Sequence, residues 1–411
     1  MKSWTTPFEA SLAATGPPVH VHDTASESLL NWDSATAQFY VCGITPYDST
    51  HLGHAATYVA FDLLNRALRH AGHHVRYVQN VTDVDDPLLE RARAHGLDWR
   101  ELAGEQTERY RQDMASLNVL PPDRFVSVEE SVSNIVDTIG HLEAVGRTYR
   151  VGSDTYFDIE PDQTLGGISK MPIHDMVALF AERGGDPARP GKRHALDPLV
   201  WRGHRTGEPS WPSPWGPGRP GWHVGCATIA QQHLGPHIDL QGGGRDLIFP
   251  HHEMTAAIAH AVHPNGPFAR VFAHVGMLRY DGEKMSKSRG NLVFVSSLRA
   301  AGVDPAAIRL VLLQHHYRSS WDWREAELAE AGEMARAWRR AFEADAGAPA
   351  DTVRRAVLAA LAQDLDAPSA VRVVQDWVDL STGVGAPAER SDREAPHQVR
   401  VLVDAALGLK L

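Results

Sequence analysis

The stretch AQFYVCGITPYDSTHLGHAATYVAFDLLNRALRHAGHHVRYVQNVTDVDD, residues 37–86, decides the fold. Its opening AQFYV predicts a short apolar strand, and the loop that follows is rich in Gly, Pro and Asp. Apolar residues then recur at helical spacing over residues 51–72, and Gly72 favours the end of a helix. Residues 74–86 alternate and are rich in Val, which predicts a second strand. A strand, a helix and a strand in this order form a βαβ unit, which implies a parallel sheet that binds ligands beyond the carboxyl ends of its strands.

The remaining segments extend this α/β fold class into a plan for the whole chain. Residues 87–120 are expected to be helical, and apolar segments at 237–250 and 269–278 are expected to supply the last strands of the sheet. We therefore expect four parts, which are a lead-in at 1–35, a catalytic domain made of 36–120 and 201–295, an inserted domain at 121–200 with a strand near 155–159, and a helical region at 296–411.

Composition limits the partners and the compartment. The 411 residues are 43% hydrophobic, enough for a large core, and the formal net charge of -11 disfavours binding to a phosphate backbone. The N-terminus lacks the apolar region of a signal peptide, and no apolar run is long enough to cross a membrane. Two cysteines do not make a disulfide framework in a chain of this length, so we expect a cytoplasmic protein with free thiols.

Cys42, Cys226 and His251 form a candidate metal site. Cys42 ends the first strand, Cys226 follows a long loop rich in Pro, Gly and Trp, and His251 follows another predicted strand. Two thiolates and an imidazole suit zinc, and three protein ligands leave the open fourth position of a catalytic zinc. On spacing alone, a buried structural role for the cysteines is an alternative, and His252 can replace His251 as the ligand.

Two short motifs are candidates for phosphate binding. In HLGH, residues 51–54, Gly53 permits a close approach of a nucleotide, and a helix N-terminus with His51 and His54 favours phosphate oxygens. In KMSKS, residues 284–288, Lys284 and Lys287 can neutralise a pyrophosphate group as its charge develops. Taken alone, HLGH also fits an ordinary helix start, and KMSKS also fits a solvated basic loop. Both together, in this order and within an α/β framework, indicate the use of ATP.

These motifs resemble those of the class I aminoacyl-tRNA synthetases, and the resemblance narrows to the cysteinyl-tRNA synthetase core. It covers roughly residues 37–320 and rests on CGITPYDSTHLGH (42–54), NVTDVDD (80–86), EPSWPSPWGPGRPGWH (208–223), QGGGRDLIFPHHE (241–253) and GEKMSKSRGN (282–291). It implies a Rossmann-like parallel sheet with an inserted connective domain and a C-terminal helical region that includes a stem-contact part. It also implies one zinc ion per chain, held by Cys42, Cys226 and His251.

Within this superfamily the chain is most similar to the mycothiol ligases, which join cysteine to glucosaminyl-inositol (GlcN-Ins). ITPYD after Cys42, the segment ERGGDP at 182–187 and the short part after KMSKS favour this group. So does Thr255, which stands where cysteinyl-tRNA synthetases carry a glutamate as a fourth zinc ligand. Gly225, where an acidic residue is expected, and KRHALDPLVW (192–201) depart from the family pattern without removing a group that the chemistry needs.

The resemblance implies an ATP-dependent ligase that forms an amide and releases AMP. Cysteine is activated as cysteinyl-adenylate, with His51 and His54 at the phosphates, Lys284 and Lys287 at the pyrophosphate, and Mg²⁺ expected to accompany ATP. The amino group of GlcN-Ins then attacks the adenylate, which gives Cys-GlcN-Ins, AMP and diphosphate in mycothiol biosynthesis. Zinc selects cysteine because serine offers no soft ligand. The implied cysteine and adenylate contacts are Cys42, Gly43, Ile44, Thr45, Thr57, Asn80, Val81, Thr82, Trp222, Gly244, Arg245, Asp246 and Leu278.

The sequence leaves several alternatives open. Trp222 is expected to wall the cysteine pocket, with a core aromatic as the alternative, and Asp246 is suited to ribose hydroxyls or to the acceptor. Asp83, Asp246 or a nearby histidine can take the proton of the attacking amine. We expect a monomer that binds no tRNA. The competing functions are a short cysteinyl-tRNA synthetase and a non-catalytic, synthetase-like binding module.

Overall fold

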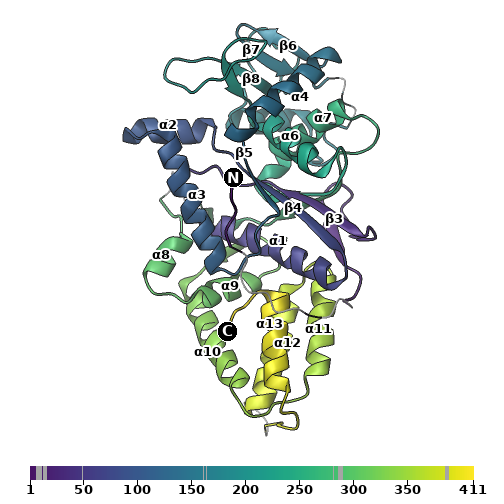
Figure 1. The fold of residues 1–411 in the computed structure, drawn as a ribbon, viewed down its shortest axis with the longest axis vertical. Helices are drawn as coiled ribbons and strands as arrows, with labels where there is room; N and C mark the ends of the chain where they lie inside the picture. The colour runs from purple at the N-terminus through teal and green to yellow at the C-terminus, as the bar shows by residue number, and fades with distance from the viewer. Residues whose placement is uncertain are drawn as a thin grey trace.

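A five-stranded parallel sheet lies at the centre of the molecule (Figure 1). The computed structural model describes residues 1–5, 12, 16–48, 50–160, 162, 164–280, 282–285, 290–384 and 388–411. The strand order is β11-β10-β3-β4-β5, and every neighbouring pair is parallel, which confirms the predicted α/β class. The strands are β3 (Thr36–Val41), β4 (His74–Val81), β5 (Arg124–Ser127), β10 (Ile238–Gly244) and β11 (Ala269–Val275).

Successive side chains of β3 show how helices cover both faces of the sheet. Phe39 packs into a core that contains α1 and the C-terminal helices, whereas Tyr40 packs into a second core with α4, α6 and α7. Neighbouring residues of a strand point to opposite faces, so both faces of this sheet must be apolar and covered. The helices are α1 (Leu52–His70), α4 (Val132–Ala144), α6 (Trp222–Leu234) and α7 (Glu253–Val262).

The predicted helical stretch 87–120 consists of two helices, α2 (Asp86–His95) and α3 (Trp99–Ser116). Gly96 adopts a positive φ of 64° at the end of α2, and the Asp98 side chain accepts from two backbone N–H groups at the start of α3. A left-handed glycine followed by an N-cap aspartate stops one helix and starts the next, which places the corner at residues 96–98.

The inserted region contains a four-stranded antiparallel sheet. The strands of this sheet and of the central sheet do not divide at residues 121 and 200. β5, inside the range 121–200, pairs with β4 of the central sheet, while β8, which crosses residue 200, and β9, inside the range 201–295, complete the smaller sheet. Sequence patterns missed this because β5 and β9 are short and pair with strands far away in the chain. The division into domains itself stays a prediction. The elements are β6 (Thr148–Val151), β7 (Asp154–Phe157), α5 (Ile173–Glu182), β8 (Leu199–Gly203) and β9 (Gly218–Pro220).

The lead-in at 1–35, expected to be irregular, contains an antiparallel pair of strands, β1 (His20–Asp23) and β2 (Ser28–Asn31). The backbone N–H of Thr24 donates to the carbonyl oxygen of Phe272 on β11 at 2.8 Å, and a carboxylate oxygen of Asp23 accepts from the N–H of Phe272. The hairpin therefore lies against the β11 edge of the central sheet.

The C-terminal part is mainly helical, as predicted, and is bound to α1 by buried charges. A carboxylate oxygen of Asp62 on α1 accepts from Arg66 and from Arg309, and Arg309 also donates to the carbonyl oxygen of Leu407 at 2.7 Å. No helix in the described ranges has both the length and the apolar character needed to cross a membrane. The elements are β12 (Leu278–Tyr280), β13 (Glu283–Lys284), α8 (Val295–Ala300), α9 (Pro305–Leu313), β14 (Trp321–Trp323), α10 (Glu325–Phe342), α11 (Ala350–Ala362), α12 (Ala367–Thr382) and α13 (Ala395–Leu407).

Candidate active site

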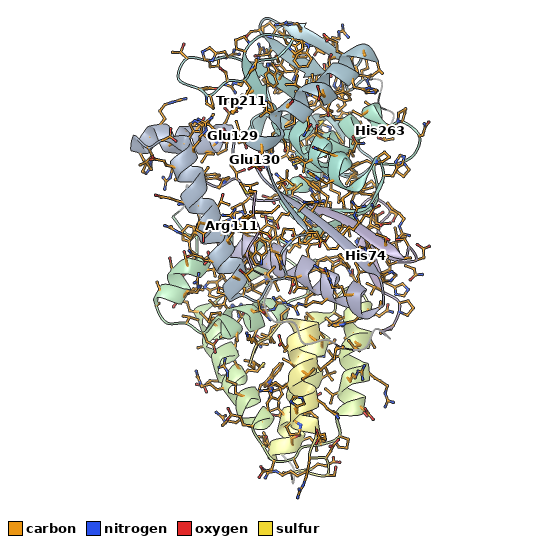
Figure 2. The ribbon with its side chains drawn as sticks, in the orientation of Figure 1. His74, Arg111, Glu129, Glu130, Trp211 and His263 are labelled. Atoms are coloured by element: carbon orange, nitrogen blue, oxygen red, sulfur yellow. The ribbon has the colours of Figure 1, made fainter. Side chains whose placement is uncertain are left out.

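The three predicted metal ligands meet beyond the carboxyl ends of the central strands. Cys42 follows β3, Cys226 lies in the second turn of α6, and His251 lies in a tight turn before α7. Their ligand atoms lie within 4.8 Å of one another, and all three side chains are buried. Figure 2 shows His74, the first residue of β4, at the amino end of that strand. The parallel sheet therefore brings two thiols and one imidazole, far apart in the chain, to one edge.

Cys42 and Cys226 lie side by side, and their surroundings shift the two thiol pKa values in opposite directions. Burial raises the pKa of the Cys42 thiol well above its ordinary value, and its hydrogen bond with Cys226 acts in the same direction. That hydrogen bond is the main cause that lowers the pKa of Cys226 well below the ordinary value, with help from His251. Nε2 of His251 lies 3.2 Å from the sulfur of Cys226. Of the two thiols, Cys226 is therefore the one whose surroundings favour the thiolate, the form that binds a soft cation.

A row of side chains behind Cys42 was not predicted. Nε2 of His252 lies 3.3 Å from Cys42 Sγ, Nδ1 of His252 lies 2.7 Å from Nε2 of His274, and Nδ1 of His274 lies 2.7 Å from Oγ1 of Thr24. Burial lowers the pKa of His252 well below its ordinary value and that of His274 to about 3, so both rings are neutral. These contacts form a continuous row from Thr24 through His274 and His252 to the sulfur of Cys42. His252 thus touches Cys42 while His251 completes the group of three.

His251 is held by its neighbours on two other sides. Nδ1 of His251 lies 3.1 Å from Nδ1 of His223, whose pKa burial lowers well below its ordinary value. The ring of Trp222 stacks on His251 with centroids 4.2 Å apart, which places this half-buried tryptophan beside the metal group. The hydroxyl of Thr255 is buried and donates to the carbonyl oxygen of His223 at 3.4 Å, so it faces the backbone and not the three ligands.

The HLGH motif forms the N-terminus of α1. Nδ1 of His51 accepts from the backbone N–H groups of Gly53 at 3.1 Å and His54 at 3.4 Å, which makes His51 the N-cap. The rings of His51 and His54 stack with centroids 3.7 Å apart. Because Nδ1 is an acceptor, any proton on the His51 ring sits on Nε2, the nitrogen that faces away from the cap. Thr57, one turn on, donates to the carbonyl oxygen of Gly53 at 3.1 Å.

The predicted adenylate loops after β3 and β4 are joined by hydrogen bonds. The side-chain oxygen of Asn80 accepts from the N–H of Gly43 at 2.8 Å, and its amide donates to Oγ1 of Thr82 at 3.0 Å. The N–H of Thr82 donates to the carbonyl oxygen of Ile44 at 2.9 Å. A Cβ atom at Gly43 would lie 1.5 Å from the carbonyl oxygen of Asn80, so only glycine fits there. Thr45 continues this loop, and Val81 is buried beneath it.

The third predicted loop, Gly244 to Asp246, follows β10 directly. Arg245 is exposed, Asp246 is half-buried, and the carbonyl oxygen of Asp246 accepts from Nη1 of Arg183 at 2.9 Å. Leu278 is buried at the start of β12. The backbone of Lys284 belongs to β13, whereas the Lys284 side chain and Lys287 lie outside the described residues.

Three carboxylates follow β4 and differ in their surroundings. Asp83 accepts from the hydroxyl of Ser127 with one oxygen and from the N–H of Glu129 with the other, so each oxygen already has one partner. Asp86 binds two guanidinium groups of the insertion. Asp85 caps α2, and burial raises its pKa to about 6. Asp85 was not singled out in the sequence, although its place before the start of a helix was a usable signal.

Comparisons with known proteins agree with this geometry. Residues 29–333 match the family described as tRNA synthetases class I (C) catalytic domain. Two proteins named L-cysteine:1D-myo-inositol 2-amino-2-deoxy-alpha-D-glucopyranoside ligase are similar over their whole length: those of Thermobispora bispora and Kineococcus radiotolerans are each 52% identical, with 100% of both chains covered.

Solved structures resemble the fold at low sequence identity. Methionyl-tRNA synthetase of Mycobacterium tuberculosis with methionyl-adenylate gives a TM-score of 0.63 at 17% identity, covering 91% of this chain and 92% of that one. The LeuRS–tRNA–LeuAMS complex of Agrobacterium radiobacter K84 gives 0.64 at 12% identity, covering 92% and 84%. At these identities the likeness concerns the fold alone.

Proposed function

The chain belongs to the family of L-cysteine:1D-myo-inositol 2-amino-2-deoxy-alpha-D-glucopyranoside ligases and contains their class I (C) synthetase catalytic domain, and on that premise we propose that it performs their reaction. It is an ATP-dependent, amide-forming ligase. L-Cysteine and ATP give cysteinyl-adenylate and diphosphate, and the amino group of GlcN-Ins then takes the cysteinyl group, with release of AMP. The product is Cys-GlcN-Ins, an intermediate of mycothiol biosynthesis.

The group Cys42, Cys226 and His251 carries this proposal, because it explains the choice of amino acid. Two thiols and an imidazole, all buried and within 4.8 Å of one another, are the donor set that zinc prefers. A zinc ion held there would act as a Lewis acid that binds the thiolate of the substrate cysteine. Serine has no thiolate and would bind such an ion poorly. The stacked Trp222 would wall this pocket, and Thr255 adds no fourth ligand, since its hydroxyl faces the carbonyl oxygen of His223.

The first half-reaction depends on positioning and charge. A carboxylate oxygen of cysteine bonds to the α-phosphorus of ATP, and the bond from that phosphorus to the pyrophosphate oxygen breaks. His51 and His54, at the positive end of α1, would stabilise the phosphate oxygens, and Mg²⁺ would accompany ATP. Lys284 and Lys287 would neutralise the leaving pyrophosphate. The adenylate would lie along Gly43–Thr45, Asn80–Thr82 and Gly244–Asp246, loops that share the carboxyl edge of the sheet.

In the second half-reaction the amine nitrogen bonds to the carbonyl carbon, the bond to the AMP oxygen breaks, and one proton leaves the nitrogen. Three candidates for the proton acceptor arise from the sequence. They are Asp83, whose oxygens each accept one hydrogen bond, from Ser127 and from Glu129, then Asp246 and a nearby histidine. We further propose a cytoplasmic monomer that does not use tRNA.

The acceptor decides the function experimentally. Purified protein with zinc, ATP and cysteine is given either GlcN-Ins or cysteine-specific tRNA, and AMP release is followed for each. We expect rapid release with the amino sugar and none above background with tRNA. Release with tRNA alone would identify a short cysteinyl-tRNA synthetase, and the absence of cysteine-dependent ATP–pyrophosphate exchange would identify a non-catalytic module.

A further inference from the structure

The segment Glu182–Pro187, ERGGDP, has no part in the reaction as derived so far, yet each of its first five residues has a structural role. α5 ends at Glu182, and the next residues form a helix-stop motif. The N–H of Gly184 donates to the carbonyl oxygen of Ala181, and the N–H of Gly185 donates to that of Phe180 at 2.8 Å. Gly184 has a positive φ of 86°, as the Schellman arrangement of a helix end requires.

Gly185 lets this turn pack closely against Phe180 of α5. A Cβ atom there would lie 2.5 Å from the ring of Phe180, which is itself buried, so the turn closes tightly only with glycine. The two glycines thus fix the direction in which the residues on either side of them leave the helix.

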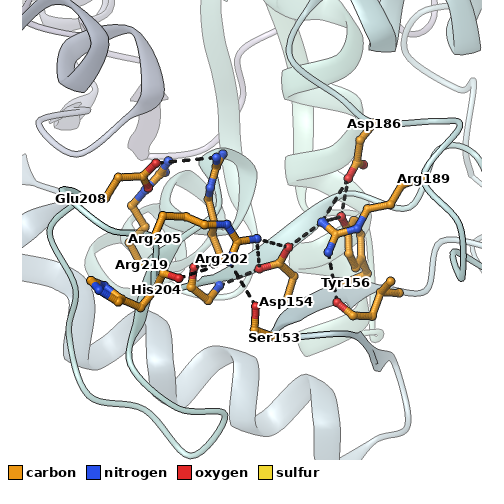
Figure 3. A network of polar contacts seen from close by, with 12 residues as sticks. Ser153, Asp154, Tyr156, Asp186, Arg189, Arg202, His204, Arg205, Glu208 and Arg219 are labelled. Carbon is orange, nitrogen blue, oxygen red and sulfur yellow. Dashed lines mark hydrogen bonds and ion pairs between the residues drawn. The ribbon is translucent and has the colours of Figure 1, made fainter. Parts of the chain in front are cut away.

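Asp186 anchors the far end of the segment to the small sheet. Its carboxylate accepts from the hydroxyl of Tyr156 on β7 and from Nζ of Lys192 at 3.1 Å. Arg189 donates to the same hydroxyl at 2.7 Å and to Asp154, the first residue of β7, so the anchor belongs to a larger network (Figure 3). Aspartate, tyrosine and two cations hold one another in place, which makes this end rigid.

Arg183, at the near end, reaches out of the inserted region to the active site. Its Nη1 donates to the carbonyl oxygen of Asp246 at 2.9 Å, in the turn that follows β10. A second contact holds the other end of the same stretch: Glu253 accepts from the N–H groups of Gly166 and Ser169, both at 2.8 Å. The inserted region therefore forms hydrogen bonds near both ends of residues 245–253, the stretch that includes His251.

We propose that Arg183 is a positioning residue that holds the turn at Gly244–Asp246 so that the Asp246 carboxylate meets the ribose hydroxyls of ATP. The inference rests on the proposed function, which places ATP at this edge. Arg183 does not touch the nucleotide; it fixes the backbone from which Asp246 projects, and ERGGDP supplies the rigid mount. The segment therefore serves nucleotide binding, the first substrate step, and not selection of the amino sugar.

The test compares three variants of the full-length, zinc-loaded protein. Arg183→Met removes the donors but keeps the apolar stem, and Arg183→Lys keeps one donor. Arg193→Met is the matched control, because Arg193 belongs to the same region and pairs with Asp158 at the surface. Michaelis constants for ATP and cysteine are measured in pyrophosphate exchange, the affinity for ATP by calorimetry, and zinc content and melting temperature for every variant.

We expect Arg183→Met to weaken ATP binding and raise the KM for ATP roughly ten-fold, the effect of losing one hydrogen bond to a charged donor. The KM for cysteine and the zinc content should stay unchanged, Arg183→Lys should recover part of the loss, and Arg193→Met should behave as the parent. Unchanged ATP affinity in Arg183→Met, or a defect seen only with GlcN-Ins, would overturn the inference. Normal ATP binding by the parent without any exchange would instead refute the proposed function.

Discussion

At the scale of residues, the candidate metal site consists of three possible ligands and of side chains that contact those ligands. Cys42, Cys226 and His251 offer soft or borderline donors, and the neutral rings of His252 and His223 touch two of them from behind. Such contacts orient a ligand and fix which nitrogen carries the proton. Removing a ligand and removing a neighbour of the group should therefore have different effects.

Cys226→Ala should lose both bound zinc and cysteine activation, because two remaining ligands rarely hold a catalytic zinc. Thr255→Ala is the matched control, since that hydroxyl lies beside His223 and adds no ligand. Zinc is measured by elemental analysis after dialysis, and activation by cysteine-dependent pyrophosphate exchange. A full equivalent of zinc in Cys226→Ala, or its loss in Thr255→Ala, would contradict the assignment of three ligands.

Asp85→Asn should stabilise the metal-free protein at neutral pH. Burial raises the folded pKa of Asp85 to about 6, above the unfolded value of about 3.9, so ionisation opposes folding. This penalty is absent below about pH 4, grows as pH rises towards 6 and is complete above it. Asparagine stays neutral and still caps α2. In urea unfolding, the advantage of the variant should grow by about 1 kcal/mol between about pH 5 and 7.5; a constant difference would refute the shift.

At the scale of elements, glycines decide where strands, helices and loops come close. Gly43 lets the loop after β3 touch Asn80 at the end of β4, whereas Gly225 lies inside α6, where a methyl group would only reach ordinary contact, 3.7 Å from Val128. The surroundings of Gly225 would therefore admit a small side chain without a clash.

The two glycines therefore predict opposite outcomes for the same substitution. Gly43→Ala should lower the free energy of unfolding by about 3 kcal/mol or more, because backbone must move to admit the methyl group. Gly225→Ala should raise it by about 0.5–1 kcal/mol, the usual gain of alanine over glycine within a helix. Both values come from urea unfolding of zinc-loaded protein, and a Gly43→Ala variant as stable as the parent would show that the loops can separate.

At the scale of the molecule, α1 is fixed at its middle to the C-terminal helices. Burial opposes ionisation of Asp62, but the charges of Arg66 and Arg309 outweigh it and hold its pKa below the ordinary value. Arg66 and Arg309 also donate to carbonyl oxygens of Asp404, Ala405 and Leu407 near the end of α13. The C-terminal helices thus brace the helix whose first turn carries His51 and His54.

Arg309→Met should lower the free energy of unfolding by about 3–5 kcal/mol, because it removes one of the two charged partners of the buried Asp62, which keeps Arg66 and the N–H of Leu120. Arg336→Met, which removes an exposed pair with Glu333 on α10, should change it by less than about 0.5 kcal/mol. Chemical denaturation of both variants provides the comparison. Equal small effects would mean that water reaches Asp62 and that the brace is weak.

Sequence patterns predicted the core of this arrangement because its signals are local. The strand, helix and strand at 37–86 and the strands within 237–250 and 269–278 are each specified by their own residues, and the structure confirms them. The sequence patterns did not predict β5 or the hairpin of β1 and β2. Strands of four residues show little periodicity, and their pairing partners are defined only in the folded chain. In the site, the resemblance to the cysteinyl-tRNA synthetase core indicated Cys42, Cys226 and His251. The contacts of Arg183 with Asp246 and of Thr24 with His274 join distant segments without any motif.

The β1–β2 hairpin brings the N-terminal part of the chain into contact with side chains next to the candidate metal site. Its Thr24 hydroxyl ends the row that runs through His274 and His252 to the sulfur of Cys42. A version trimmed to begin at Thr36 would keep every motif quoted above and would lose the Thr24 hydroxyl from this row.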